Sequence, residues 1–206
     1  SIIPNFTLDI IDKFPDKPWS SISLNENFTI EWIEKHPNIK WNWSYISKHK
    51  NITLDIIKKH HDKPWNLTTI IQNPNFSSEW ISTFSEMNGP DLYWGYFGIS
   101  VQPNLKLDWL IKFPDKPWEW EYISICENLT LEWLILFQEK PWDWSSISEN
   151  ENLTLEWLTQ FPNKDWDWEL LSQNLNLKLE WIDKYPNKPW CWYNISENPS
   201  LTIEIV

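Results

Sequence analysis

Histidine side chains are the first candidates for metal binding or acid–base chemistry in this sequence. The chain has four of them, His36, His49, His60 and His61, and only the last two lie together, directly before Asp62. Adjacent residues do not share a helix face, and no cysteine or second histidine pair lies nearby. We therefore predict no metal site. The chain also lacks a phosphate-binding loop, a dinucleotide fingerprint and zinc-ligand spacing.

Charged residues recur at fixed intervals, but without the partners that catalysis needs. One column is acidic and consists of Asp9, Glu31, Asp55, Glu79, Asp108, Glu132, Glu156 and Glu180. A second column is basic and consists of Lys17, Lys40, Lys63, Lys116, Lys140, Lys164 and Lys188. A catalytic site combines a nucleophile, a base and an orienting group, and no such set recurs. Helix-terminal charge and ion pairs explain both columns, so we expect no enzymatic activity and no cofactor.

The 19 tryptophans could stack on sugars or other small ligands if they were exposed. Their columns argue against this. One column has Ile10 and Ile56 in two copies and otherwise holds Trp32, Trp80, Trp109, Trp133, Trp157 and Trp181. Another has Leu67 in one copy and otherwise holds Trp43, Trp120, Trp144, Trp168 and Trp192. A column that tolerates Ile or Leu fills volume, so we interpret these tryptophans as core residues. Glycan or small-ligand binding stays an alternative.

The composition excludes further classes. The net charge is −12, and the chain contains neither alanine nor arginine, so all 17 basic residues are lysines. An acidic chain repels phosphate backbones, and we expect no nucleic-acid partner. No run approaches the ~18 apolar residues that a membrane helix requires, and we expect no membrane partner.

One pattern organises nearly the whole chain. The segment 152–158 recurs at 128–134 and 176–182, and looser copies start at residues 5, 27, 51, 75 and 104. The starts lie 24 residues apart except for intervals of 22 and 29. We predict a single repeat domain over residues 1–206 with about eight copies, a partial copy at 200–206 and an irregular insertion at about 85–100. Position 1 of each repeat is the residue at its start.

Each repeat is predicted to form two short helices. In the first half, Thr154 is the expected N-cap, Leu155, Leu158 and Phe161 form an apolar stripe, and Pro162 stops the helix. The second half opens on Lys-Pro-Trp and continues as Trp-x-Trp-x-x-Ile-Ser, with a residue such as Asn42 or Asp143 as N-cap, and Asn150 can close the turn.

Helices of about two turns are not stable alone, because an isolated helix needs about 12 residues. Stacked repeats must bury their apolar faces. The predicted fold is all-α, a solenoid of stacked short helix pairs. The alternative is a β-containing, leucine-rich-repeat-like solenoid, since Leu153, Leu155 and Trp157 alternate. That alternation breaks at Leu158, and a charged residue interrupts every copy.

Three strings carry a resemblance. The patterns Asn-x-Thr-x-Glu-Trp, Phe-Pro-x-Lys-Pro-Trp and Trp-x-Trp-x-x-Ile-Ser together resemble the tryptophan-rich tandem repeats of giant amoeba-infecting, mimivirus-like DNA viruses. The resemblance covers residues 5–206 and is weakest in the copy that starts at residue 75. It implies an intracellular viral protein, in the host cytoplasm or the virion, that was expanded by duplication. It implies no catalytic residues.

Asparagines and cysteines fit the same setting. The nine glycosylation sequons start at Asn5, Asn27, Asn42, Asn51, Asn66, Asn75, Asn128, Asn152 and Asn194. Most of them coincide with a predicted helix start, so we attribute them to capping. Cys126 and Cys191 fall at positions 23 and 16 of repeats that lie three apart. Their separation is of order 30 Å at ~9 Å per helix layer, too far for a disulfide. We expect free thiols in a reducing environment.

Positions that vary between repeats are the candidate contact residues. Ile135 and Leu136 replace a polar pair on the first helix, and Tyr45 and Tyr122 precede the Ile-Ser pair of the second. The insertion adds an aromatic cluster of Tyr93, Trp94, Tyr96 and Phe97. We expect each of these groups either to contact a partner or to reflect only a local difference in packing between repeats.

We therefore expect a non-enzymatic scaffold that binds a protein partner. The second hypothesis is a structural component of a viral particle, built by self-assembly or from a longer repeat array. We also expect that the chain is a piece of a longer array, or else that another chain covers its ends, since solenoid ends need polar caps.

Overall fold

The structure is a computed structural model that describes residues 9–14, 17, 19–86, 92 and 98–201. The described residues form α-helices and two short 3-10 helices, and none of them lies in a strand. This confirms the α-solenoid of short helix pairs and decides against the leucine-rich-repeat alternative.

The chain divides into two compact units, each of which is a stack of repeats. The N-terminal unit comprises Ser1–Tyr93 with Phe97–Ile99, and the C-terminal unit comprises Trp94–Tyr96 with Ser100–Val206. The helices before residue 90 are α1 (Asp9–Lys13), η1 (Trp19–Leu24), α2 (Ile30–Lys35), α3 (Trp43–Ser47), α4 (Leu54–Lys59), α5 (Leu67–Ile70) and α6 (Ser78–Glu86).

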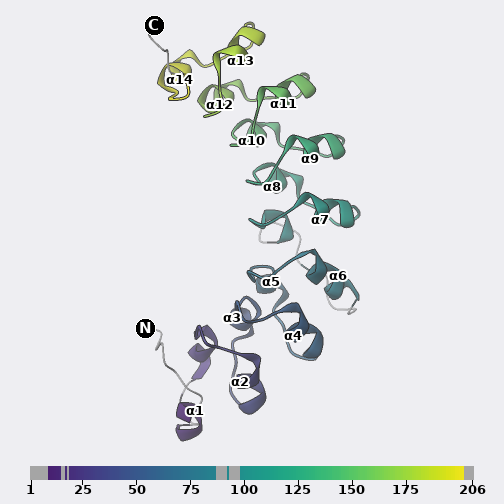
Figure 1. The fold of residues 1–206 in the computed structure, drawn as a ribbon, viewed down its shortest axis with the longest axis vertical. Helices are drawn as coiled ribbons and strands as arrows, with labels where there is room; N and C mark the ends of the chain where they lie inside the picture. Colours follow the sequence, from purple (N-terminus) through teal and green to yellow (C-terminus); the bar gives the residue numbers. More distant parts are fainter. Residues whose placement is uncertain (1–8, 15–16, 18, 87–91, 93–97, 202–206) are drawn as a thin grey trace. The chain divides into compact units, whose positions relative to one another are not determined.

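In the C-terminal unit, first and second helices alternate along the chain. After η2 (Ile99–Val101) come α7 (Leu107–Lys112), α8 (Trp120–Ser124), α9 (Leu131–Leu136), α10 (Trp144–Ser148), α11 (Leu155–Gln160), α12 (Trp168–Gln173), α13 (Leu179–Lys184) and α14 (Trp192–Glu197). The first helices α7, α9, α11 and α13 lie along one side of this unit and the second helices along the other (Figure 1). Consecutive second helices pack on each other.

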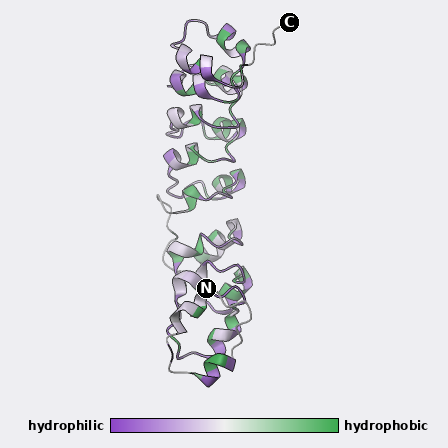
Figure 2. Ribbon diagram, turned by 90° about the vertical axis from the view of Figure 1, so that its left-hand side faces the viewer, coloured by the Kyte–Doolittle hydropathy of each residue, from purple (hydrophilic) through white to green (hydrophobic). Residues whose placement is uncertain are grey.

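Four repeated apolar positions build the core of each unit. In the repeat that starts at residue 128 these are Leu129, Trp133, Leu134 and Ile147, all buried. All six tryptophans of the first column are buried, as expected for core residues, and the isoleucines that replace them, Ile10 and Ile56, are partly buried. Each helix also carries hydrophilic residues, so its apolar part can face the stack (Figure 2).

The helix ends show which capping predictions hold. Most second helices begin as predicted, since the side chain of Asn42 accepts hydrogen bonds from two backbone N–H groups and that of Asp143 does the same, whereas α8 and α14 have no side-chain cap. The prediction for Thr154 is only half right, since it lies at the N-cap but its hydroxyl makes no capping bond. At the equivalent Thr29 the hydroxyl instead bonds to the carboxylate of Glu31, and this bond is the largest cause of that carboxyl's lowered pKa.

First helices that are followed by a proline end where the proline rule predicts, and α4 and α9 end at the same position although His61 and Gln138 stand in place of the proline. Helix α11 stops at Gln160, with Phe161 as C-cap directly before Pro162. The indole Nε1 of Trp166 then donates to the Phe161 carbonyl oxygen at 2.8 Å. Trp41, Trp65, Trp118, Trp142 and Trp190 make the same bond to the residue five positions earlier. This tryptophan therefore closes the first helix and also fills volume.

Candidate functional site

Buried asparagines at position 23 join consecutive repeats. The side chain of Asn174 donates from Nδ2 to the carbonyl oxygens of Ser148 at 3.0 Å and Asn150 at 3.1 Å, both in the preceding repeat. Its Oδ1 accepts from the backbone N–H of Asn176 at 2.8 Å. Asn73 and Asn198 make the same set of bonds, and Asn150 makes part of it. We call this column the asparagine ladder; sequence reasoning saw Asn150 only as a residue that closes a turn.

A histidine takes the place of asparagine at one rung. The Nε2 of His49 lies 3.0 Å from the Asn25 carbonyl oxygen and donates to it, because Nδ1 accepts from the backbone N–H of Asn51 at 3.1 Å. Burial lowers the pKa of His49, so the neutral ring that makes both bonds is favoured. The imidazole thus reproduces the donor and the acceptor of the amide.

Cys126 holds the same position in another repeat, where burial raises the pKa of its thiol. Cys126 and Cys191 are both free, as predicted from their spacing. Neither is paired with a metal-ligating neighbour, and the described part of the chain contains no cluster of three or more metal-ligating side chains.

The asparagines at position 1 make a second set of contacts between repeats. Asn152 Nδ2 donates to the carbonyl oxygens of Glu127 at 2.7 Å and Leu129 at 3.1 Å, and Asn75, Asn128 and Asn176 bond the equivalent carbonyls. The capping role predicted for the sequon asparagines at position 1, such as Asn152, is therefore wrong, whereas the sequon asparagines Asn42 and Asn66 do cap second helices. The first helix begins three residues after the asparagine at position 1, as α11 begins at Leu155 after Asn152. The side-chain amide instead bonds to the main chain of the preceding repeat.

A buried serine at position 21 completes the contacts between repeats. The Oγ of Ser148 accepts from the backbone N–H of Asp167 at 3.0 Å and donates to the Trp144 carbonyl oxygen at 2.7 Å. The same serine–backbone bond recurs from Ser23, Ser47, Ser100, Ser124 and Ser172. This bond fixes the start of a second helix to the second helix of the preceding repeat.

The second tryptophan column packs against the repeat that follows. Trp144 and Trp166 form an edge-to-face pair with ring centroids 5.0 Å apart, and the Lys164 ammonium lies 5.4 Å from the Trp144 ring. Trp120 and Trp168 have equivalent partners. These contacts support the interpretation of most tryptophans as core residues. Trp192, the last of the column, is 64% exposed.

A groove runs along the ends of the second helices in the C-terminal unit, formed by three successive cavities. The first, about 160 Å³, is lined by Val101, Pro103, Tyr122, Ile125 and Glu127 among others. The middle one, about 190 Å³, is lined by Ile125, Glu127, Ser146, Glu149, Asn150 and Glu151. The third, about 510 Å³, is lined mainly by Glu149, Glu151, Leu170, Gln173 and Leu175. Neighbouring cavities share residues, and we call the whole the second-helix groove.

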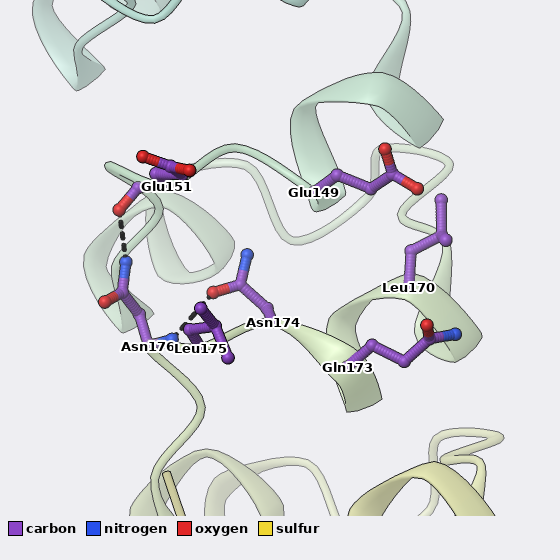
Figure 3. Close-up of a pocket in the computed structure, with 7 residues that line it drawn as sticks. All are labelled: Glu149, Glu151, Leu170, Gln173, Asn174, Leu175 and Asn176. Carbon is purple, nitrogen blue, oxygen red and sulfur yellow. Dashed lines mark hydrogen bonds between the residues drawn. The ribbon is translucent and has the colours of Figure 1, made fainter. Parts of the chain in front are cut away.

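The third cavity is built from two repeats. Glu149 and Glu151 follow α10, whereas Leu170 and Gln173 lie on α12 and Leu175 follows it (Figure 3). Two bonds of the position-1 asparagines shape one wall, since Asn176 donates to the Glu151 carbonyl oxygen and to that of Leu153. The groove therefore rests on the same hydrogen bonds that hold the repeats together.

The predicted contact residues fall into three groups. Ile135 and Leu136 are 45% and 52% exposed on α9, and Tyr45 is exposed on α3. Tyr122 lines the second-helix groove. The cluster of Tyr93, Trp94, Tyr96 and Phe97 lies outside the described residues, as does most of the predicted insertion.

Sequence reasoning missed several exposed apolar residues, and three of them bear on the candidate contact surfaces. Ile111 lies on α7 at the position that Ile135 occupies on α9. Ile125 and Leu175 line the groove and are 59% and 67% exposed. Each occupies a position that is polar in most other repeats, which is the signal that could have identified them.

Three of the four histidines, His36, His49 and His60, make contacts between repeats of the N-terminal unit. His36 Nε2 lies 3.5 Å from an Asp12 oxygen and His60 Nε2 lies 3.5 Å from a Glu34 oxygen, each across a repeat boundary.

Among the described residues, every helix falls short of the length and apolarity that a bilayer-spanning segment requires. Comparisons with protein families, curated proteins and solved structures found no match to this chain.

Proposed function

We propose that this protein is a non-enzymatic repeat scaffold that binds another protein. The observation that supports it is an apolar patch on the first-helix side of the C-terminal unit, formed by Ile111, Ile135 and Leu136. These side chains are exposed on first helices of neighbouring repeats, where the next repeat has Thr159 and Gln160. Large apolar side chains that gather on an otherwise polar face mark interaction sites.

Capture from cell lysate tests this function. The chain is immobilised, bound proteins are identified by mass spectrometry, and the best candidate is purified and titrated against the chain. We expect Ile135→Asp/Leu136→Asp to lose the partner because two charges enter an apolar contact. Thr159→Asp/Gln160→Asp makes matched changes on α11 and should keep it. A partner retained equally by both variants, or no stoichiometric partner at all, would refute the proposal.

A second candidate function is a structural array, supported by the way in which second-helix tryptophans pack against the repeat that follows them. Trp168 is covered by Trp190 and Lys188 of the repeat that follows it. A further Lys-Pro-Trp repeat would cover Trp192 in the same way. Sedimentation velocity of the chain and of Trp192→Ser tests this role. Concentration-dependent assembly that the substitution abolishes would support it, and a monomer at all concentrations would not.

The resemblance to tryptophan-rich repeats of giant amoeba-infecting viruses supports a viral setting for either role. A scaffold of this kind would act in the host cytoplasm during infection, and a structural array would be abundant in purified particles. Quantitative mass spectrometry of infected cells and of virions distinguishes the two.

A further inference from the structure

We propose that the second-helix groove binds an extended peptide segment in which a lysine or arginine is flanked on each side, three residues away, by an apolar residue. This goes beyond the proposed function, because it concerns the second-helix side of the C-terminal unit and names the chemistry of the ligand. The geometry of three cavities, the order of their side chains and the unpaired charge on this side carry it.

The three cavities follow one another at one step per repeat. The first and second share Ile125 and Glu127, and the second and third share Glu149 and Glu151. A ligand that enters one cavity is therefore led into the next. A continuous, narrow and open course of this kind suits an extended main chain better than a compact ligand.

The chemistry of the lining changes along the groove. The first cavity is mainly apolar, with Tyr122 and Ile125 beside Val101 and Pro103. The middle cavity has three carboxylates, from Glu127, Glu149 and Glu151. The third adds Leu170 and Leu175 to the shared carboxylates. The first cavity is thus mainly apolar, the middle one is acidic, and the third places two leucines beside two of these carboxylates and three amide side chains. This order predicts a ligand with a central cation and an apolar residue at each side.

The middle carboxylates form no ion pair with any described residue. The second-helix halves of this unit, 119–127, 143–151, 167–175 and 191–199, contain nine acidic residues and no lysine. Lysines of the unit lie in the first halves, and three of them, Lys140, Lys164 and Lys188, stack over tryptophans. No ion pair forms among the described residues of this unit. A basic partner supplies the missing charge.

The spacing of the ligand follows from the spacing of the repeats. Packed helices lie about 8–10 Å apart, so one cavity follows the next at about that distance. An extended chain in the polyproline II conformation advances about 3.1 Å per residue with three residues per turn, so side chains three positions apart point to the same side. About three residues therefore separate the side chains that enter neighbouring cavities, and the pattern is apolar-x-x-Lys/Arg-x-x-apolar.

Other ligands fit less well. Nucleic acid is repelled by the carboxylates. A bound metal ion would need its ligands gathered around one point, and the described residues contain no such cluster. An acidic peptide meets like charge in the middle cavity.

Fluorescence anisotropy with synthetic peptides tests the proposal on the full chain. The probe is labelled Ser-Leu-Ser-Thr-Lys-Thr-Ser-Leu-Ser. One control peptide has Glu in place of Lys. In another, the Lys and the Ser at one end of the peptide exchange places, so that the composition is kept and the spacing is changed. We expect the probe to bind at least about tenfold more tightly than the Glu peptide and several-fold more tightly than the exchanged peptide, and its binding to weaken with added salt.

Matched protein variants localise the binding. Glu149→Gln/Glu151→Gln should weaken the probe about fivefold, the effect of a lost exposed charge pair. Leu175→Ser should weaken it while leaving the preference for Lys over Glu unchanged. Glu132→Gln/Glu156→Gln makes the same charge change at exposed positions on α9 and α11 and should alter affinity less than about twofold. Circular dichroism confirms that each variant is folded.

Four results would overturn the proposal. They are no binding at millimolar probe, equal binding of the Lys and Glu peptides, equal binding of the exchanged peptide, and an equal loss in the two glutamine variants. The last would show only a general attraction between an acidic protein and a cation. None of these results bears on the capture experiment with Ile135→Asp/Leu136→Asp, so the proposed function and this inference can fail separately.

Discussion

Asn174→Ala measures how strongly the asparagine ladder holds the repeats together. The substitution removes three hydrogen bonds, from Nδ2 to the Ser148 and Asn150 carbonyl oxygens and from the Asn176 N–H to Oδ1. Each buried bond contributes about 1 kcal/mol net, and its loss leaves a buried partner unsatisfied. We expect the free energy of unfolding of the C-terminal unit to fall by about 3 kcal/mol. This is a large effect, because most substitutions cost about 0.5–3 kcal/mol.

The assay is urea unfolding followed by tryptophan fluorescence and circular dichroism. Two variants calibrate it. Asn163→Ala changes the same residue type at an exposed site and should cost less than about 0.5 kcal/mol. Asn174→His should cost clearly less than alanine, since His49 shows that an imidazole can supply both the donor and the acceptor at this rung. Because repeats are coupled only to their neighbours, Asn174→Ala should also lower the denaturant dependence or split the transition.

The outcome that refutes this reasoning is specific. If Asn174→Ala unfolds at the same urea concentration as Asn163→Ala, the ladder bonds do not stabilise the fold. If the histidine variant is as unstable as the alanine variant, the column selects for amide shape and not for its hydrogen-bonding groups. Hydrogen exchange would then show whether residues 150–200 lose protection in one variant and not in the other.

Three further predictions concern other columns. The lowered pKa of His49 means that folding favours its neutral form, so its contribution to stability is present above about pH 6.5 and is lost as the pH falls below that value towards its folded pKa. His49→Asn should remove this part of the pH dependence, and urea titrations of both proteins between about pH 7.5 and 5.5 would reveal an unchanged slope if the idea is wrong. Burial raises the pKa of Cys126, so in Cys191→Ser it should react with iodoacetamide more slowly in the folded than in the urea-unfolded chain; equal rates would contradict this. Trp142→Phe removes the indole bond to the Phe137 carbonyl oxygen and should cost about 1–3 kcal/mol in urea unfolding, whereas a loss below about 0.5 kcal/mol would make that bond dispensable.

The helices could be predicted from the sequence because their signals are local. Phe161 before Pro162 sets the end of α11, and Asp143 caps α10 with its own side chain. Periodicity also identified the buried tryptophan column, since Trp133 and Trp157 share their position with isoleucines in other repeats. These features depend on residues a few positions apart.

The contacts between repeats could not be read in the same way. Asn152 and Thr154 fit a capping pattern, yet Asn152 bonds to carbonyls 23 and 25 residues earlier. Distances in sequence do not reveal which main-chain carbonyls lie within reach. The groove was missed for the same reason, because Ile125, Glu149 and Leu175 come together only when consecutive repeats stack in register.

The repeated bonds between neighbours also decide how freely such repeats can be exchanged. The asparagine at position 23, the asparagine at position 1 and the serine at position 21 each join a side chain of one repeat to the main chain of another. Every amino acid supplies a carbonyl, and every one except proline supplies an N–H. These hydrogen bonds require no matched pair of side chains to be inherited together. Repeats with different exposed residues can therefore replace one another. Duplication or recombination can reorder them without changing the hydrogen bonds between repeats.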